Sequence, residues 1–582
     1  MLLRGFIFFI VLVASTSAFA EILTVSIKGT DKQQSANIRA YLGKVPETEQ
    51  LRASFIFNAR SASEKAMQAI GYYHSSVKLD LDKSKKVWHL TLHVHPGPET
   101  TLTEVSIRVL GEAKDHRGFK KIGQESGLIV GKRLNHGAYN EVKSQLLSRG
   151  LNLGFFDSKL TQSRIEVNRN NNTAKVFLEY DSGPRNRLGE VTFVGTDLES
   201  DLLYQMVDFE PGSPYRSRKL NKLNSELAES GYFSSIKVLP LIDERSDNIV
   251  PVRVELTPAP RHKVDLGVGY STDSKGRVST TWRTPKINKY GHSQETKLEY
   301  SKVNPYLRFR YNVPLEHPTN DVLQFGLGVE SNEYADLDST MYTALIGRNT
   351  VNDGWVRQYY VRYLQERWDV LEDRNRGEFI LPGITLSKLH RRGNPLDPEH
   401  GFRQIYLMEM AGEELGSDAT IVRAQAQFKW VNRFAEKHRL VTRANFGASY
   451  NEDRELSDVP PSLRFYAGGD ESIRGFSYQS LGPRIDYVDA EGEDQTITIG
   501  GRYLAVGSLE YQYYVTEKWR VVTFSDFGNA FDDVETDIEA AYSVGGGVHW
   551  MSPVGAIKVE VGYGISEDDP PWRLHISMGA EL

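Results

Sequence analysis

The C-terminal half of the chain alternates apolar with polar residues over many consecutive segments, and this alternation constrains the fold more than any other feature. In the final segment one face carries Leu574, Ile576, Met578, Ala580 and Leu582, and the other carries Arg573, His575, Ser577, Gly579 and Glu581. A period of two residues is typical of a strand whose two faces meet different surroundings. From about residue 261 we count roughly 16 such segments. None between them has the pattern of a crossover helix, so antiparallel hairpins are expected.

Charged residues on one face and apolar residues on the other favour a membrane barrel, with a wet lumen inside and lipid outside. A soluble all-β protein also alternates, but it is not expected to stack so many long strands with charges on one side. No long apolar run follows Ala20, and the mean hydropathy is −0.44, so helical membrane spans are excluded. We therefore predict a 16-stranded antiparallel transmembrane β-barrel over residues 261–582.

The first 20 residues are typical of a secretory signal peptide. Arg4 precedes the apolar run Phe6–Ala14, and Ala18-Phe19-Ala20 has the small-x-small pattern of a cleavage site. The chain has no Cys, which avoids mispairing in an oxidising compartment. Its net charge is −6, so the chain lacks the excess of basic residues that is typical of proteins that bind nucleic acid.

Three segments between residues 21 and 260 repeat one another. Gly71, Gly154 and Gly231 each precede aromatic residues and recur at intervals of about 80 residues. Each segment has the order β-α-α-β-β, and the boundaries are 21–98, 99–184 and 185–260. The helices of the second and third segments are expected to stop at Gly150 and Gly231. The order resembles that of POTRA domains, whose open sheet edge can accept an added strand.

The long polar segment 451–500 lies between two strand-like runs and has an ordered interior. Gly468 and Gly469 permit a sharp turn, and the tip that follows is Arg474-Gly475-Phe476. A charged guanidinium inside a barrel needs an acid. Alternation on the segment Trp519–Ala530 points Asp526 inward, and Gly528 beside it leaves room for a loop side chain. We predict that Arg474 pairs with Asp526 in the lumen.

These residues resemble a motif of the BamA/TamA superfamily of outer-membrane insertases, in which an RGF-type loop folds into the lumen against an Asp-x-Gly strand. The matching residues are Gly468, Gly469, Arg474, Gly475, Phe476, Asp526 and Gly528. Three POTRA-like modules, rather than five or two, resemble the TamA branch, which is named for a translocation and assembly module. The resemblance implies a Gram-negative outer membrane, periplasmic modules, clients such as autotransporters, and a TamB-like inner-membrane-anchored partner on the N-terminal modules.

The resemblance also implies a lateral gate where the first and last barrel strands meet. Its predicted residues are Val264, Gly267 and Gly269 on the first strand and Leu574, Ile576, Met578 and Leu582 on the last. Glycine weakens strand pairing. A secretion pore of the two-partner type and a phospholipid conduit between the membranes remain alternatives.

No enzymatic activity, cofactor or metal is expected. The sequence Gly468–Ser472, GGDES, is close to a diguanylate-cyclase signature, but strand-like segments flank it in place of an α/β domain. His93 and His95 lie on the same face of a strand and could bind a metal ion, but the sequence suggests no third ligand for it. The sequence contains no Gly-x-Ser-x-Gly element, which would supply the serine nucleophile of a lipase.

Overall fold

The computed structural model describes residues 22–579 except 372, 452–455, 489–492, 534–538, 554 and 568. The predicted signal peptide and Leu582 lie outside the described residues. The chain divides into two compact units, one formed by 22–192, 209–221 and 240–252, the other by 193–208, 222–239 and 253–579. Among the described helices, none combines the length and the apolar character needed to cross a membrane.

The N-terminal part contains three modules with the predicted order β-α-α-β-β. The first contains β1 (Leu23–Lys28), α1 (Lys32–Leu42), α2 (Glu49–Ala69), β2 (Ser76–Asp82) and β3 (Trp88–His95). The second contains β4 (Thr101–Leu110), η1 (Gly111–Ala113), α3 (Arg117–Gln124), α4 (His136–Leu153), β5 (Lys159–Asn168) and β6 (Thr173–Asp181). The third contains β7 (Arg187–Val194), α5 (Ser200–Tyr204), α6 (Ser217–Glu229), β8 (Phe233–Pro240), η2 (Ile242–Glu244) and β9 (Ile249–Pro258).

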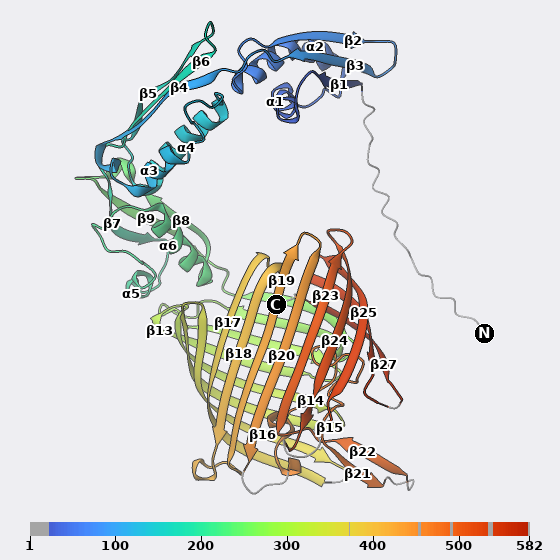
Figure 1. The fold of residues 1–582 in the computed structure, drawn as a ribbon. Helices are drawn as coiled ribbons and strands as arrows, with labels where there is room; N and C mark the ends of the chain where they lie inside the picture. The colour runs from blue at the N-terminus through green and yellow to red at the C-terminus, as the bar shows by residue number, and fades with distance from the viewer. Residues whose placement is uncertain are drawn as a thin grey trace. The chain divides into compact units, whose positions relative to one another are not determined.

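Each module forms a three-stranded sheet in which its last strand lies in the middle, with the orders β1-β3-β2, β4-β6-β5 and β7-β9-β8. In the first two sheets the central strand runs parallel to the first strand and antiparallel to the other. Figure 1 shows the helices on one side of the sheet in these two modules. Alternate strand residues and the helices' apolar faces meet there, as at the fully buried Ile38, Leu90 and Leu92.

The repeated glycines end the second helix region of each module. Gly71, Gly154 and Gly231 all have positive φ, a conformation that a residue without Cβ adopts without strain. The predicted helix stop at Gly150 is wrong, because α4 continues to Leu153 and ends on Gly154. Gly150 instead serves packing: a Cβ there would lie 1.9 Å from the hydroxyl oxygen of Tyr180.

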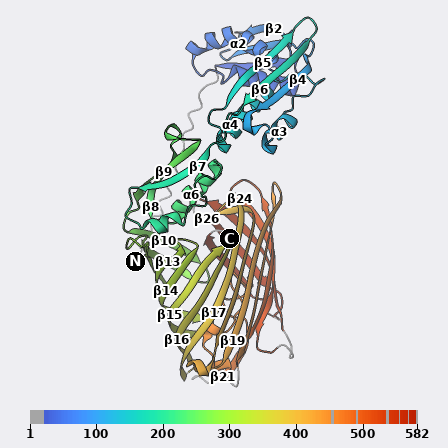
Figure 2. The same ribbon diagram turned by 90° about the vertical axis from the view of Figure 1, so that its left-hand side faces the viewer.

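The C-terminal part is a closed barrel of 16 antiparallel strands, so the predicted fold class is confirmed. Its first eight strands are β10 (Lys263–Ser271), β11 (Lys275–Thr284), β12 (Ser293–Ser301), β13 (Tyr306–His317), β14 (Asp321–Tyr334), β15 (Leu337–Asn352), β16 (Trp355–Val370) and β17 (Asp373–Asn394). The others are β18 (Asp397–Ala411), β19 (Ile421–Ala435), β20 (His438–Asn451), β23 (Tyr503–Tyr514), β24 (Trp519–Phe531), β25 (Ala541–Ser552), β26 (Gly555–Gly564) and β27 (Trp572–Gly579). Figure 2 shows these strands tilted side by side in one wall.

The two faces of the wall differ as the alternation predicts. On β24, Asp526 is fully buried on the lumen side, whereas its neighbour Phe527 is 50 % exposed on the outer side. The same contrast recurs on β26, where Glu560 is buried and Val559 and Val561 are exposed. Successive residues of a strand point to opposite faces. The face on which one residue lies therefore determines the face of every other residue in that strand.

The segment between β20 and β23 has two parts. The first contains η4 (Leu456–Asp458), η5 (Pro461–Leu463) and the glycine-rich tip, and its residues are largely buried against the inner wall. The second is a hairpin of β21 (Arg484–Val488) and β22 (Asp494–Thr498), which lies beyond one end of the wall in Figure 1. Only the first part occupies the lumen, so the expectation of a lumen-inserted loop over all of 451–500 is wrong for this hairpin. We call residues 456–483 the lumen loop.

Candidate functional site

The tip of the lumen loop takes its shape from three glycines in left-handed conformations. Gly468 and Gly469 both have φ of +100°, and Gly475 has φ of +96°. A Cβ on Gly468 would lie 2.3 Å from the carbonyl oxygen of Ser477, inside the same loop. Glycine is therefore required here both by the backbone conformation and by the close approach of the chain to itself.

Arg474 anchors this tip to the wall. Its Nε donates to Asp526 Oδ2 and its second terminal nitrogen donates to Oδ1, each at 2.8 Å, and its backbone N–H donates to Oδ2 at 3.0 Å. The first terminal nitrogen reaches Glu510 Oε2 at 2.6 Å and Glu560 Oε1 at 3.1 Å. The guanidinium also stacks 3.4 Å from the centroid of the Phe524 ring. The pair predicted from the sequence is thus present, within a larger cluster.

We define the arginine cluster as Arg474, Asp526, Glu510, Glu560 and the hydroxyl of Ser508, which accepts from Arg474 at 3.1 Å. All five are buried, so the charges of Arg474 and of the three carboxylates are removed from water. Such burial is compensated only when the geometry is good and the remaining hydrogen-bonding positions are filled. The two-pronged contact with Asp526 meets that condition.

Gly475 and Phe476 complete the contact of the tip with the wall. A Cβ on Gly475 would lie 3.1 Å from backbone atoms of Gly562, Tyr563 and Gly564 on β26. The ring of Phe476 is buried in an apolar cluster that it shares with Phe465, Ala467, Ile473, Leu481, Leu504, Val506, Ala530 and Ala541. The loop is therefore held by close backbone packing and apolar burial as well as by charge.

Gly528 serves a different purpose from the one predicted. Its φ is +128°, and a Cβ there would lie 2.0 Å from the carbonyl oxygen of Ala505 on the neighbouring strand β23. The expectation that Gly528 leaves space for a loop side chain is wrong, because this space is filled by the backbone of β23. The glycine is needed by the wall itself.

Sequence reasoning missed four residues that complete the site: Glu510, Glu560, His575 and Asp470. The imidazole of His575 on β27 accepts from the N–H of Gly475 at 2.8 Å through Nε2, and its Nδ1 bonds Asp470 Oδ1. Alternation assigns Glu510, Glu560 and His575 to the lumen face. However, only the tertiary structure brings them to the loop tip.

Two clusters of the described residues bring three potential metal ligands within 4.8 Å of one another. They are Asp273, Asp470 and His575, and Glu510, His549 and Glu560. A ligating histidine donates from its second ring nitrogen, but Nε2 of His575 accepts the Gly475 N–H. In the other cluster Arg474 already binds both carboxylates. The observed bonding in both clusters supports hydrogen-bonded and ion-paired roles.

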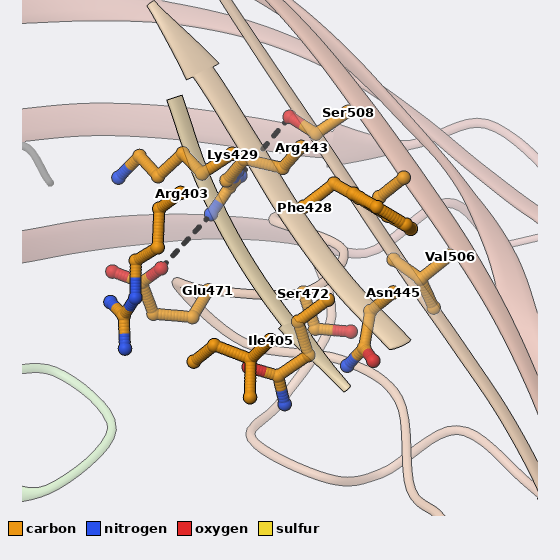
Figure 3. Close-up of a pocket in the computed structure, with 12 residues that line it drawn as sticks. Arg403, Ile405, Phe428, Lys429, Arg443, Asn445, Glu471, Ser472, Val506 and Ser508 are labelled. Atoms are coloured by element: carbon orange, nitrogen blue, oxygen red, sulfur yellow. Dashed lines mark hydrogen bonds and ion pairs between the residues drawn. The ribbon is translucent and has the colours of Figure 1, made fainter. Parts of the chain in front are cut away.

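A cavity of about 200 Å³ lies between the lumen loop and strands β18, β19, β20 and β23 (Figure 3). Arg403, Lys429 and Arg443 face it from the wall, and Glu471 and Ser472 face it from the loop. Arg443 bonds the hydroxyl of Ser508 at 3.1 Å and forms an ion pair with Glu471 at 3.5 Å. This side of the loop is thus held by polar contacts around a hollow, in contrast to the packed side at β26.

The predicted gate residues lie on the two strands that close the barrel. Between β10 and β27 the register of the described residues contains a single pair, Ser271 with Ser577. The N–H of Thr272 donates to the carbonyl of Ile576 at 3.0 Å. By contrast, β10 pairs with β11 along its whole length, from Lys263 to Ser271. We call this weakly paired junction the seam.

Val264 and Leu266 on the first strand are strongly exposed, Leu266 to 80 %, and Leu574 on the last strand is also exposed. Gly267 and Gly269 lie on β10, where they pair with Ser279 and Arg277 of β11. Ile576 and Met578 lie on β27 and pair with Val559 and Ile557 of β26.

The fold and the site define an outer-membrane β-barrel whose lumen holds a loop of the same chain and whose N-terminal modules are of the POTRA type. The family described as "Omp85 superfamily domain" matches residues 261–581, and the chain belongs to this superfamily. "POTRA domain TamA domain 1" matches residues 24–96, and "Surface antigen variable number repeat", a POTRA family, matches residues 186–259. Membership places the barrel in the outer membrane and the modules in the periplasm.

Relatives include the "Outer membrane protein assembly factor BamA" of Nitratidesulfovibrio vulgaris, 26 % identical over 63 % of this chain and 48 % of its own length. The chain thus spans about half the length of that relative. The protein of the same name from Neisseria meningitidis is 20 % identical over 87 % of this chain and 69 % of its own. The crystal structure of Haemophilus ducreyi BamA lacking POTRA domains 1–3 matches the fold with a TM-score of 0.67 and 15 % identity, over 82 % of this chain and 99 % of that one.

Proposed function

We propose that this protein is a TamA-type assembly factor that helps β-barrel clients such as autotransporters to insert into the outer membrane through the seam. The observation that carries the proposal is the contrast between β10 and its two neighbours. It is paired along its length with β11 and, among the described residues, at one position with β27. A strand edge with little pairing can template an incoming strand by β-augmentation.

No chemical step is required for this activity. The hydrocarbon core forbids unpaired backbone groups, so a client strand needs a hydrogen-bonding partner while it enters. The edge of β10 supplies such a partner at the boundary between lumen and lipid. The exposed Val264, Leu266 and Val268 match the lipid environment that the client must reach.

A disulfide across the seam tests this function. The chain has no native Cys, so Ser271→Cys with Ser577→Cys forms the only pair. Client assembly is expected to stop in the oxidised protein and to return after reduction. A control pair, Ser279→Cys with Glu299→Cys, crosslinks β11 to β12 away from the seam and should leave assembly intact.

Normal client assembly in the seam-locked protein would contradict lateral insertion. If the locked protein instead kept a large ion conductance that depends on the lumen loop, a two-partner-type secretion pore would be favoured. If the lock altered phospholipid distribution between the membranes and spared the clients, a lipid conduit would be favoured.

The N-terminal module is proposed to bind a TamB-like, inner-membrane-anchored protein. Two observations support this: the match of residues 24–96 to the first TamA POTRA domain, and two large apolar side chains of α2 that are exposed, Phe57 at 84 % and Leu51 at 61 %. Phe57→Ser is expected to reduce co-purification of the partner, whereas a change at the buried Met67 would act through folding.

A further inference from the structure

Asp470, next to the glycine pair of the lumen loop, contacts both sides of the seam. On the side of the last strand its Oδ1 bonds Nδ1 of His575. On the side of the first strand the same oxygen accepts from the hydroxyl of Thr272 at 3.1 Å, and the N–H of Asp470 donates to Asp273 Oδ2 at 2.6 Å. One loop residue is thus bonded to the turn that follows β10 and to β27.

The hydroxyl of Thr272 extends this connection. It donates to Asp470 and accepts from the N–H of Ile576 at 3.3 Å. His575 extends it on the other side, since its Nε2 accepts the N–H of Gly475 beside the arginine cluster. A continuous set of hydrogen bonds therefore runs from Thr272 through Asp470 and His575 to the loop tip.

These bonds are substantial compared with the direct pairing of the two strands. The described residues of β10 and β27 share one register pair, and Asp470 is a charged acceptor in a largely enclosed position. Hydrogen bonds to charged groups are about twice as strong as neutral ones. The position of the loop therefore contributes strongly to whether the seam stays closed.

We infer that Asp470 and His575 are positioning residues that make the lumen loop a strap across the seam, so that the loop must leave its place before the two strands separate. This inference rests on the proposed function for its biological meaning. The strap couples two parts of the site, the arginine cluster and the seam, that the sequence presents as separate features.

Amide hydrogen exchange of the purified full-length protein in lipid nanodiscs tests the strap without any client. In Asp470→Asn, the remaining carbonyl oxygen can still accept from Thr272 and His575, but the negative charge that strengthens both hydrogen bonds is lost. Peptides from both Lys263–Ser271 and Trp572–Gly579 are expected to exchange roughly tenfold faster than in the wild type. Peptides from β25 should exchange at the wild-type rate.

Glu471→Gln is the matched control, because Glu471 is the next acid in the same loop and its largely exposed carboxylate pairs with Arg443 on β20, while the bond from Arg443 to the carbonyl of Asp470 does not involve that carboxylate. Seam exchange in Glu471→Gln should equal that of the wild type. Wild-type seam exchange in Asp470→Asn, or equal acceleration in both variants, would overturn the inference.

Thr272→Val supplies a second, independent variant that leaves the loop sequence unchanged. If Thr272 and Asp470 act through their shared hydrogen bond, the double variant should exchange less rapidly than the product of the single effects predicts. Strictly multiplicative effects would overturn the strap. Accelerated exchange in Asp470→Asn, combined with normal client assembly in the disulfide-locked protein, would leave the strap standing and remove the proposed function.

Discussion

Arg474 and Asp526 form a two-pronged ion pair inside the barrel, with both nitrogen–oxygen distances at 2.8 Å and a third bond from the backbone N–H of Arg474 at 3.0 Å. The backbone and the side chain of one loop residue are therefore directed at one carboxylate. This geometry determines the orientation of the loop tip as well as its position, because rotation about any single bond would break another.

Replacing Arg474 should release the loop. Arg474→Ala leaves three buried carboxylates without their shared cation, which is expected to cost about 3–5 kcal/mol. Arg474→Lys should recover only part of this, since an ammonium group cannot make the two-pronged contact. Protease cleavage within residues 456–483 of the intact protein reports the release. Full wild-type protection in Arg474→Ala would contradict the anchoring role.

Exchanging the charges of the pair should fail to restore the loop. In the double variant Arg474→Asp with Asp526→Arg, the new aspartate faces Glu510 and Glu560, which lie within 3.1 Å of the native guanidinium. Like charges at that separation repel strongly in a buried site. If Arg474 and Asp526 were an isolated pair, exchanging their charges would restore part of the contact; the neighbouring carboxylates of Glu510 and Glu560 prevent this. The same cleavage assay distinguishes the two outcomes.

A methyl group at Gly562 should push the loop tip away from the wall. Its Cβ would lie 2.4 Å from the backbone nitrogen of Gly475, and neither backbone can move freely. We expect a loss of about 1–3 kcal/mol in the stability of the docked loop. The matched control is Gly276→Ala on β11, where a Cβ meets no atom within 4 Å. Equal loop protection in both alanine variants would show that the contact is unimportant.

Asp397, at the start of β18, holds two fully buried arginines together. Its Oδ1 accepts from Arg439 at 2.7 Å and from Arg520 at 3.0 Å. Asp397→Asn removes the negative charge they share and is expected to destabilise the barrel by about 3–5 kcal/mol. The temperature at which the folded band disappears in heat-modifiability gels should fall. Glu399→Gln, which alters a largely exposed pair with Arg433, should leave that temperature unchanged.

The second module should lose stability in acid through His116. This residue caps α3, where its Nδ1 accepts the N–H of Gly118 at 3.1 Å. Burial lowers the pKa of His116, and the nearby Arg185, Arg149 and Arg216 lower it further. The unfolded chain therefore binds a proton below about pH 6.5 more readily than the folded module does. Stability is full above that pH and declines as the pH falls towards the folded-state pKa.

His116→Asn is expected to remove this pH dependence, since asparagine keeps an acceptor for the cap and does not titrate. The measurement is the ratio of variant to wild-type proteolysis rates within residues 101–181 of the full-length protein, between about pH 5 and 8. A ratio that stays constant across this range would exclude His116 as the acid-sensitive group.

The sequence alone determined the architecture. A period of two over the C-terminal half predicts the strands, their number and the side of the wall on which each residue lies, because alternation is a local property of extended backbone. The interval of about 80 residues between Gly71, Gly154 and Gly231 predicts three modules in the same way. The inward direction of Asp526 and the need for an acid near Arg474 also follow from local pattern and charge.

Only the tertiary structure decided which residues meet at the site. Glu560 and His575 lie 86 and 100 positions from their partners in the loop, and alternation states their face without stating their height on the wall. That height depends on the register between neighbouring strands and on the offset between the first and last strands where the barrel closes. Both are properties of the whole barrel. For the same reason the single seam pair, the contacts of Asp470 on both sides of it, and the continuation of α4 past Gly150 against Tyr180 were settled by packing between segments distant in sequence.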